Sequence, residues 1–540
     1  MIFNTRHWTA YLFYAYLAVL VWVPMPLASR PLWAASFFNI GVSVLSMVAL
    51  IGCYRTGHPL PEALRRAGWV FLVWGVYLGW LLYQAWAGYS INVFHSRQQF
   101  WLSLSYVQLF ALTLFLVDTR DRVKLLFYVL VGSGLFQALY GSLMAMSGVD
   151  KIWWIEKVQH RGMATGTFRN RNQLANYLVM CIALGSGLLL ASQRSRGFGS
   201  WRDVARRLLD WLLSGAGWLR LLLVALVIGV VLTHSRMGNM SLFVSLTVVG
   251  VIWLLRSQLS WKRSVALLGS LLLVDTLIVG SWFGLDKVVE RLQETEARHF
   301  TQWVGANAEP DDDALDAAPA VSAAAAPATV PTTTPAPAPA VTTTTAAENP
   351  PTTPMSSPVA AAPVNNATVT SAKPVKRQRD NELRDEAFPQ LLQMAQDHWQ
   401  TGIGLGNFRT GFTAYSRLNA MGIYNEAHCD YLQFVIETGA IGTGSLAVIV
   451  LYCFGSAVKA LWTRRSHLIQ GAGFATTMAM TASLMHAWVD FNFQSPATTS
   501  LFIVVMAVAV LVNGLPSGHA QMKQANRVRR EPFSLTGESL

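Results

Sequence analysis

The stretch YNEAHCDYLQFVIETG, residues 424–439, closes the longest polar interruption of this 540-residue chain and leads into an apolar run. From Cys429 onward its apolar side chains recur with the period of a helix; they are Tyr431, Leu432, Val435 and Ile436. The stretch therefore predicts a helix that enters a membrane from an aqueous loop, with His428 at the entrance. We expect Asn425 to be the N-cap and to contact substrate, because free N–H groups of a first helical turn attract anions. Taken alone, His428 could equally be a residue that only hydrates a helix end.

The composition excludes an ordinary soluble protein. Hydrophobic residues make up 53% of the chain and charged residues 13%, and the mean hydropathy is +0.36. The net charge of +12 does not indicate a nucleic-acid partner, because the basic residues form short clusters between apolar runs. Three of the four cysteines fall inside apolar runs, so the sequence predicts no structural disulfide, and it contains no metal-binding motif.

Apolar runs long enough to cross a membrane recur along the chain. A hydrocarbon core of about 30 Å requires roughly 20 apolar residues per helix. This length predicts an all-α polytopic membrane protein with about twelve transmembrane helices. The predicted spans are residues 9–27, 33–53, 69–87, 100–117, 125–146, 174–191, 219–232, 240–255, 265–283, 432–454, 471–489 and 499–512.

Basic residues follow every even-numbered span, as after the second at Arg55 and after the fourth at Arg120. The positive-inside rule then places both termini in the cytoplasm and the exits of odd-numbered spans on the outer side of the membrane. Arg169, Arg171 and Arg236 would lie on the outer side, against this rule. Binding of an anion is one reason for their position.

The predicted organisation has four parts. Residues 1–284 hold nine membrane helices, and residues 285–431 form a loop on the outer side. Residues 432–515 hold the last three helices, and residues 516–540 form a cytoplasmic tail.

The outer loop is itself heterogeneous. Residues 309–371 are rich in Ala, Pro and Thr, cannot bury a core and are expected to be disordered. Residues 377–431 resume a helical pattern and are expected to form part of the active site. The predicted buried face of the helix over residues 377–400 consists of Phe388, Leu391, Leu392 and Ala395.

Two segments carry candidate anion-binding groups. In GTFRNRNQLANYL, residues 166–178, Arg169 and Arg171 could hold phosphate oxygens, and Asn172 could add amide donors. Alternatively, this segment is a hydrated loop. In LTHSRMGN, Arg236 lies between two spans, where a charge needs hydration, a partner or a ligand. A structural ion pair is the alternative there.

Two other patterns are interpreted as structural. Gly402, Gly404 and Gly406 resemble a nucleotide loop, but no strand precedes them, so a turn that returns the preceding helix to the membrane is favoured. His486 and Asp490 are one helical turn apart and are expected to form a local pair at a helix end.

Five segments together resemble the O-antigen ligase and Wzy polymerase superfamily of bacterial membrane glycan transferases. They are GTFRNRNQLANYL, LTHSRMG, the combination of Arg384 with GIGLGNF, EAHCDYLQFVIETGAIG and HAWVDFNFQSPATTSLF. The chain departs from the family pattern at Met237, Phe388, Trp399 and Cys429. The resemblance spans residues 166–502, and the Ala/Pro/Thr-rich insert lies outside the pattern.

The resemblance implies an enzyme that uses a glycan on undecaprenyl diphosphate as donor. The acceptor would be a hydroxyl of lipid A–core, of another glycan or of a protein. The residues matching the family's functional positions are Arg236, Arg384 and His428, and no cofactor or metal is implied. The cations would stabilise the leaving diphosphate, and His428 would deprotonate the acceptor in an inverting displacement.

Three alternatives stay open at the level of sequence. The first is a protein O-oligosaccharyltransferase of the same superfamily. The second is a transporter of lipid-linked glycan, which is expected to carry charges deep inside several spans. The third is a scaffold that holds envelope partners through residues 309–371.

Overall fold

The computed structural model describes residues 8–192, 215–256, 269, 376–416, 425–464 and 466–515, with the backbone alone at 215–216 and 376–386. The chain divides into two compact units, residues 1–288 with 379–540, and residues 289–378. The described residues belong to the first unit, apart from residues 376–378. The predicted insert at 309–371, the ninth span at 265–283 (apart from residue 269) and the tail at 516–540 lie outside the described residues.

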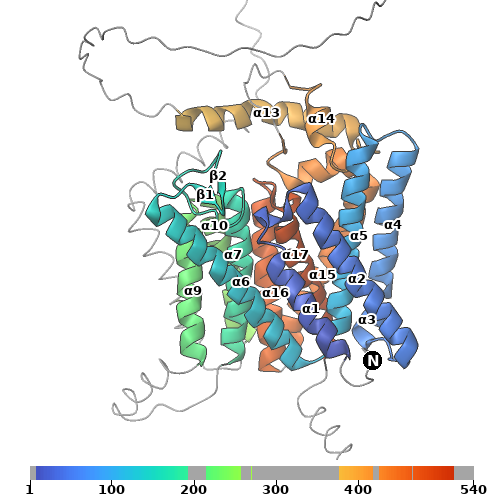
Figure 1. The fold of residues 1–540 in the computed structure, drawn as a ribbon, viewed down its shortest axis with the longest axis vertical. Helices are drawn as coiled ribbons and strands as arrows, with labels where there is room; N and C mark the ends of the chain where they lie inside the picture. The colour runs from blue at the N-terminus through green and yellow to red at the C-terminus, as the bar shows by residue number, and fades with distance from the viewer. Residues whose placement is uncertain are drawn as a thin grey trace, which may run out of the picture. The chain divides into compact units, whose positions relative to one another are not determined.

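Almost all described secondary structure is helical (Figure 1). The elements are α1 (Trp8–Trp22), η1 (Leu27–Ser29), α2 (Leu32–Thr56), α3 (Glu62–Arg66), α4 (Gly68–Trp86), α5 (Val93–Leu116), α6 (Arg120–Ser147), β1 (Lys151–Ile152), β2 (Ile155–Glu156), α7 (Arg171–Ala191), α9 (Gly215–Leu232), α10 (Arg236–Arg256), α13 (Lys376–His398), α14 (Phe408–Phe412), α15 (Asp430–Thr463), α16 (His467–Ala487), η2 (Asn492–Gln494) and α17 (Pro496–Leu511). The two strands form a short antiparallel hairpin in which Lys151 pairs with Glu156.

The predicted fold class is confirmed. Eleven of the twelve predicted spans coincide with helices of the described chain, and seven of these are long and apolar enough to cross a membrane. Three shorter apolar helices, α1, α9 and α17, accompany them. The protein is therefore an all-α, multi-pass membrane protein.

The boundaries of the first span differ from the prediction. Helix α1 ends at Trp22 rather than at residue 27, because Pro24 and Pro26 follow. Leu27, Ala28 and Ser29 then all adopt the left-handed conformation, with φ of 53°, 58° and 55°. This left-handed turn leads directly into α2.

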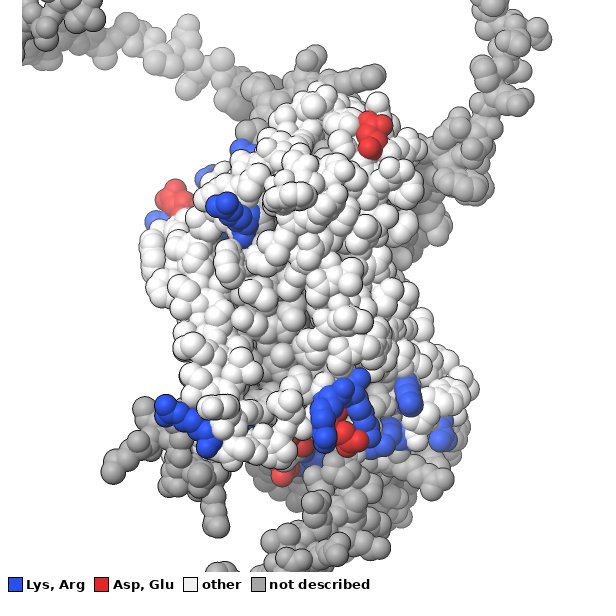
Figure 2. Space-filling model, turned by 90° about the vertical axis from the view of Figure 1, so that its right-hand side faces the viewer, with Lys and Arg blue, Asp and Glu red and all other residues white. Residues whose placement is uncertain are grey.

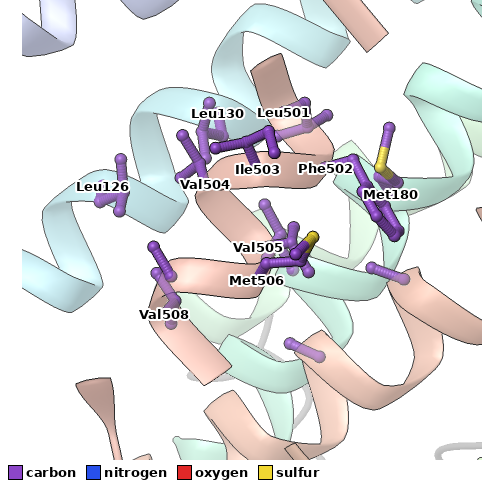
Figure 3. Packing of buried hydrophobic residues seen from close by; sticks show 14 of the residues in the cluster. Leu126, Leu130, Met180, Leu501, Phe502, Ile503, Val504, Val505, Met506 and Val508 are labelled. Carbon is purple, nitrogen blue, oxygen red and sulfur yellow. The ribbon is translucent and has the colours of Figure 1, made fainter. Parts of the chain in front are cut away.

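Helices α7 and α17 form the centre of the bundle. Every residue of α7 from Gln173 to Leu190 is buried, as is nearly every residue of α17. Figure 3 shows α17 side chains such as Leu501 and Val504 against Leu130 of α6, and Phe502 beside Met180 of α7. Helices that are apolar on all sides fit such a position.

Helices α7 and α16 are held together at two levels. A Cβ atom on Gly187 would lie 2.3 Å from the backbone oxygen of Gly471, so only glycine fits at this contact. Farther along the pair, the buried Ser483 hydroxyl lies 3.1 Å from Oδ1 of Asn176. The two helices are thus fixed to each other along their length.

The predicted helix over residues 377–400 is confirmed as α13, but its predicted buried face is wrong in part. Leu391 and Ala395 are buried, whereas Phe388 and Leu392 are 54% and 42% exposed. The buried face instead adds Ala387 and Met394, which pack against a small cluster with Phe408, Phe412 and Ile436. This partner surface, rather than side-chain size, decides which face turns inward.

The glycine-rich segment forms the turn expected from the sequence. Gly402, Gly404 and Gly406 all have positive φ, and Gly404 N–H donates to the Glu437 carbonyl at 2.9 Å. Gln84 of α4 donates to the same carbonyl at 3.1 Å. The turn therefore fastens the segment after α13 to α4 and to α15.

Charged side chains concentrate at the ends of the bundle. Figure 2 shows Lys and Arg gathered near its lower end, whereas the middle of the visible face is free of charge among the described residues. This distribution is typical of a membrane protein.

Candidate functional site

The site is built around the start of α15. Helix α15 begins at Asp430, and its N-cap is Cys429, whose side chain makes no capping hydrogen bond. The prediction that Asn425 caps this helix is therefore wrong, since the chain between 425 and 429 is not helical. His428 adopts the left-handed conformation, with φ 52°. A non-glycine residue in this conformation is unusual and is held by its surroundings.

His428 faces an aspartate from a distant part of the chain. Its Nδ1 lies 3.8 Å from Oδ1 of Asp490, whose side chain is only 3% exposed. The His428 side chain is 28% exposed, so the pair has a buried carboxylate and a partly accessible imidazole. The edge of the ring also contacts Phe491, with ring centroids 4.8 Å apart.

Asp490 is fixed by backbone contacts on both sides. Its Oδ1 accepts from Phe491 N–H at 2.9 Å, and its carbonyl accepts from Asp430 N–H at 3.2 Å. The local pair with His486 predicted from the sequence is present, with Nε2 4.0 Å from Oδ2. Asp490 therefore stands between two histidines, and sequence reasoning identified only the nearer one along the chain.

Asp430 fastens the start of α15 to the segment after α16. Its Oδ2 accepts from Phe493 N–H at 3.0 Å, and its Oδ1 lies 3.4 Å from Nε2 of Gln494. These bonds join the two chain segments that carry His428 and Asp490.

The predicted arginine-rich segment lies at the start of α7. Asn170 is the N-cap, and its Oδ1 accepts from Asn172 N–H at 2.8 Å. Arg171 donates from Nη1 to the His234 carbonyl at 3.1 Å, so this residue helps to hold the turn before Arg236. Arg169 is exposed and Asn172 partly buried. The role of Asn170 was missed, although an Asn before an apolar helix is a readable cap signal.

Arg236 is the first residue of α10 and is exposed. The preceding Ser235 accepts from Gly238 N–H at 3.2 Å and so closes the first turn. A chain of contacts leads from this turn to His428. Arg171, the first residue of α7, binds the His234 carbonyl. Gln173, in the first turn of α7, donates to the carbonyl of Phe491 at 3.2 Å, and the Phe491 ring contacts His428.

The predicted site residues fall into two groups. His428, Arg171 and the turn before Arg236 are linked through these contacts at one end of the bundle. Arg384 lies in α13, at a position where the structure describes the backbone alone. Its role stays a prediction, as do those of Arg169, Asn172 and Asn425.

A further arginine, which the sequence analysis did not single out, lies beside the pair. Arg30 forms an ion pair with Glu426 through Nη2 and Oε1. Its guanidinium carbon also lies 5.6 Å from the centre of the Phe491 ring, whose other contact is His428. No motif identifies Arg30, because it lies in a short connection between two spans.

Burial controls the acid–base properties of the segment before α15. It raises the pKa of Glu426, an effect that the neighbouring Arg30 opposes but does not cancel. Burial likewise raises the pKa of the Cys429 thiol. A buried thiol with a raised pKa is a poor nucleophile, in agreement with the assignment of chemistry to His428 rather than to Cys429.

No group of three or more His, Cys, Asp or Glu side chains with metal-binding geometry occurs in the described part of the chain. The arrangement thus offers an imidazole beside a buried carboxylate and arginines at nearby helix starts. Such a set can accept a proton and can bind an anion.

A family model described as O-antigen ligase matches residues 221–447, which contain the turn with Arg236, α13 with Arg384, the glycine turn and the His428 segment. The search of curated proteins found no match.

Proposed function

The chain belongs to the O-antigen ligase and Wzy polymerase superfamily, an assignment that rests on the match over residues 221–447, and from this premise we propose its reaction. We propose that it transfers a glycan from an undecaprenyl-diphosphate-linked donor to an acceptor hydroxyl at the periplasmic face of the bacterial inner membrane. The reaction needs no metal or cofactor in this proposal. The membership supports glycan transfer in general, and the donor, the stereochemistry and the location are our proposals.

One observation carries the proposal: the imidazole of His428 lies 3.8 Å from the buried carboxylate of Asp490 at a helix start. A carboxylate at Nδ1 favours the tautomer in which Nδ1 bears the proton and Nε2 is the acceptor. The distance exceeds that of a hydrogen bond, and such contacts commonly tighten when substrate binds. His428 then acts as the general base, and Asp490 orients it.

The transfer balances as a single displacement. The acceptor oxygen attacks the anomeric carbon, and the bond from that carbon to the diphosphate oxygen breaks with its electron pair leaving on the diphosphate. The hydroxyl proton passes to Nε2 of His428. Attack opposite to the leaving group inverts the anomeric carbon.

Cations stabilise the charge that grows on the leaving diphosphate. Arg236 is exposed at the first turn of α10, where helix N–H groups also favour an anion. We assign the same task to Arg384 and to Arg169, with Arg171 and Asn172 shaping the adjoining start of α7. Asn425 is exposed beside His428 and is assigned to substrate contact rather than to capping.

The direct test uses purified protein in lipid nanodiscs with a labelled undecaprenyl-diphosphate-linked glycan and candidate acceptors. The proposal requires a product with inverted anomeric configuration, formed in the presence of EDTA. Retention of configuration in the product refutes the displacement. A requirement for a divalent metal refutes the metal-independent mechanism. Movement of the intact donor across the bilayer without transfer indicates a transporter.

The acceptor class is read from the cell. In a strain lacking the chain, loss of all long glycans on lipid A identifies a ligase, and single-repeat products identify a polymerase. Loss of protein glycans with intact lipopolysaccharide identifies a protein-directed transferase.

Deletion of residues 309–371 separates an enzyme from a scaffold. We expect transfer to stay within about twofold of the full chain, because the proposed site lies in other segments. Purified deletion variant and full chain should be compared at equal amounts in the same nanodisc assay. Loss of function in cells with transfer retained in vitro would favour the scaffold.

A further inference from the structure

The connection between α1 and α2 is shaped by an unusual backbone. Three successive non-glycine residues, Leu27, Ala28 and Ser29, adopt the left-handed conformation. This conformation costs roughly 1–2 kcal/mol per residue for L-amino acids, so surrounding contacts must hold it. The Ser29 hydroxyl supplies one such contact by donating to the Val23 carbonyl at 2.6 Å. Arg30 is the residue that leaves this turn.

The same connection is bonded to the arginine-rich segment before α7. The Thr167 hydroxyl donates to the Pro24 carbonyl at 2.6 Å, and Trp153 Nε1 donates to the Met25 carbonyl at 3.0 Å. Oε1 of Gln137 in α6 accepts from the N–H of Thr167 at 2.9 Å and also lies 2.9 Å from the Thr167 hydroxyl oxygen. The base from which Arg30 extends is therefore fixed to α6 and to the start of α7.

From this base Arg30 reaches the segment that carries His428. It pairs with Oε1 of Glu426, and Oε2 of Glu426 accepts from Gln433 Nε2 at 3.0 Å. Gln433 in turn accepts from the N–H of Ala427 at 3.0 Å. These contacts hold Glu426 and Ala427, the two residues that precede His428. The Arg30 guanidinium also lies over the ring of Phe491.

We infer that Arg30 is a positioning residue for the proposed transfer, acting through Glu426 and Phe491 to hold His428 against Asp490. The inference rests on the proposed function, and it assigns a task to the connection between α1 and α2. The left-handed turn then has a reason: it presents a guanidinium to a helix start that lacks a side-chain cap of its own. Residual strain at such a turn is typical of functional segments.

An alternative task for Arg30 is direct contact with the donor diphosphate. The two tasks make different demands on charge. Positioning needs opposite charges at 30 and 426 in either order, whereas contact with a diphosphate needs the positive charge at 30. Positioning acts on kcat, and diphosphate contact in the ground state acts on KM as well.

The first experiment measures the position of the segment without any substrate. In a chain whose Cys53, Cys181 and Cys453 are replaced by alanine, we expect the remaining Cys429, which is 9% exposed, to react slowly with a water-soluble maleimide. We expect Arg30→Ala to raise the rate of Cys429 modification at least tenfold at pH 7. The matched control is Arg66→Ala, which removes an exposed arginine–glutamate pair within one helix and should leave the rate unchanged. An unchanged rate in Arg30→Ala overturns the inference.

The second experiment measures transfer by purified variants. Arg30→Ala, Arg30→Glu and Glu426→Arg should each lower kcat by roughly 10- to 100-fold with donor KM within threefold. The exchanged pair, Arg30→Glu with Glu426→Arg, should recover at least fivefold over Arg30→Glu. Failure of the exchanged pair to recover, or a KM raised tenfold or more in Arg30→Ala, overturns positioning and favours contact with the diphosphate.

The two proposals fail separately. If the unmodified protein transfers no glycan, the proposed function falls, and the maleimide rates still report whether Arg30 holds the segment. If the unmodified protein transfers glycan and Arg30→Ala behaves like Arg66→Ala in both experiments, only the present inference falls.

Discussion

Helices α7 and α15 both start next to the segment that follows α16, but they are closed in different ways. Helix α7 is capped locally, because the side chain of Asn170 accepts from the N–H of Asn172, two residues later. Helix α15 has no side-chain cap, and its first N–H donates instead to the backbone of Asp490. A local cap makes a helix start self-sufficient, whereas α15 depends on residues from other parts of the chain. The side chain of His428, two residues before α15, faces Asp490 rather than the first turn of the helix.

The two starts should respond to substitution in opposite ways. Changes at the start of α7 should lower stability more than activity, and changes around the start of α15 should lower activity more than stability. The predictions below test this contrast in order of decreasing effect.

Loss of the His428 imidazole should have the largest effect. His428→Ala and His428→Asn should each lower kcat by at least about 10³-fold, since the proposed base is removed. Asparagine tolerates the left-handed backbone at this position, so the second variant separates chemistry from strain. Transfer rates and thermal unfolding are to be compared for purified variants. Activity of His428→Asn within tenfold of the unmodified enzyme would remove the base from the proposal.

Arg236→Ala should abolish transfer to a similar degree while the protein stays folded in the membrane. Arg236 is exposed at the start of α10. Its proposed task is to stabilise the leaving diphosphate, an effect that can be worth about 10²- to 10³-fold in rate. The rate should fall with all acceptors alike. A loss confined to one acceptor would show that Arg236 binds that acceptor instead.

Asp490→Asn should lower kcat by about 10²-fold, with little change in the donor KM. The amide keeps the size of the side chain but removes the charge that we propose to orient and stabilise the His428 imidazolium. The comparison variant is His486→Gln, because His486 lies near Oδ2 of the same carboxylate, whereas His428 lies near Oδ1. An equal loss of kcat in both variants would indicate that Asp490 only maintains packing.

At the start of α7, Asn170→Ala should cost about 1 kcal/mol of stability, which is typical for removal of a cap. The kcat should stay within about threefold of the unmodified protein. Asn170→Ser retains a capping oxygen and should restore most of the loss in thermal unfolding. A large fall in kcat without a change in stability would contradict the contrast between the two starts.

The smallest effect concerns pH and Glu426. Burial raises the pKa of this carboxyl, so the folded protein holds its proton more tightly than the unfolded chain does. Its contribution to stability is therefore fully present below the unfolded pKa and is lost as pH rises through the folded pKa. Glu426→Gln cannot ionise, and its free energy of unfolding relative to the unmodified protein should rise with pH. Thermal unfolding between pH 4 and pH 8 measures this, and a variant that loses relative stability with rising pH would contradict it.

The sequence predicted the membrane helices well because their length and apolarity are local properties. It placed the end of α1 too far toward the C-terminus, since the apolar run continues through Pro24 and Pro26 into the left-handed turn. It also mispredicted the exposed sides of Phe388 and Leu392, because the inner face of α13 is chosen by its packing partners. The hydrophobic period of a segment does not indicate which distant residues will pack against it.

The candidate site was predictable only where a motif or an unusual charge marked it. His428 and Arg236 were predicted in this way, and Asp490 was noticed only for its local contact with His486. The approach of Asp490 to His428 depends on the folded arrangement of α15 and α16. Arg30 was missed because PMPLASRP gives no chemical signal, and its meaning comes from Glu426, almost four hundred positions later in the chain.

The contact between Gly187 and Gly471 limits how the protein can admit substrates as large as a lipid-linked glycan. Two helices whose backbones touch at one level and are joined by Ser483 and Asn176 at another cannot hinge apart without losing both contacts. We expect α7 and α16 to behave as a stationary wall during turnover. Movements that admit and release a bulky sugar chain must then take place in other helices. Cross-linking α7 to α16 should therefore leave the turnover rate unaltered.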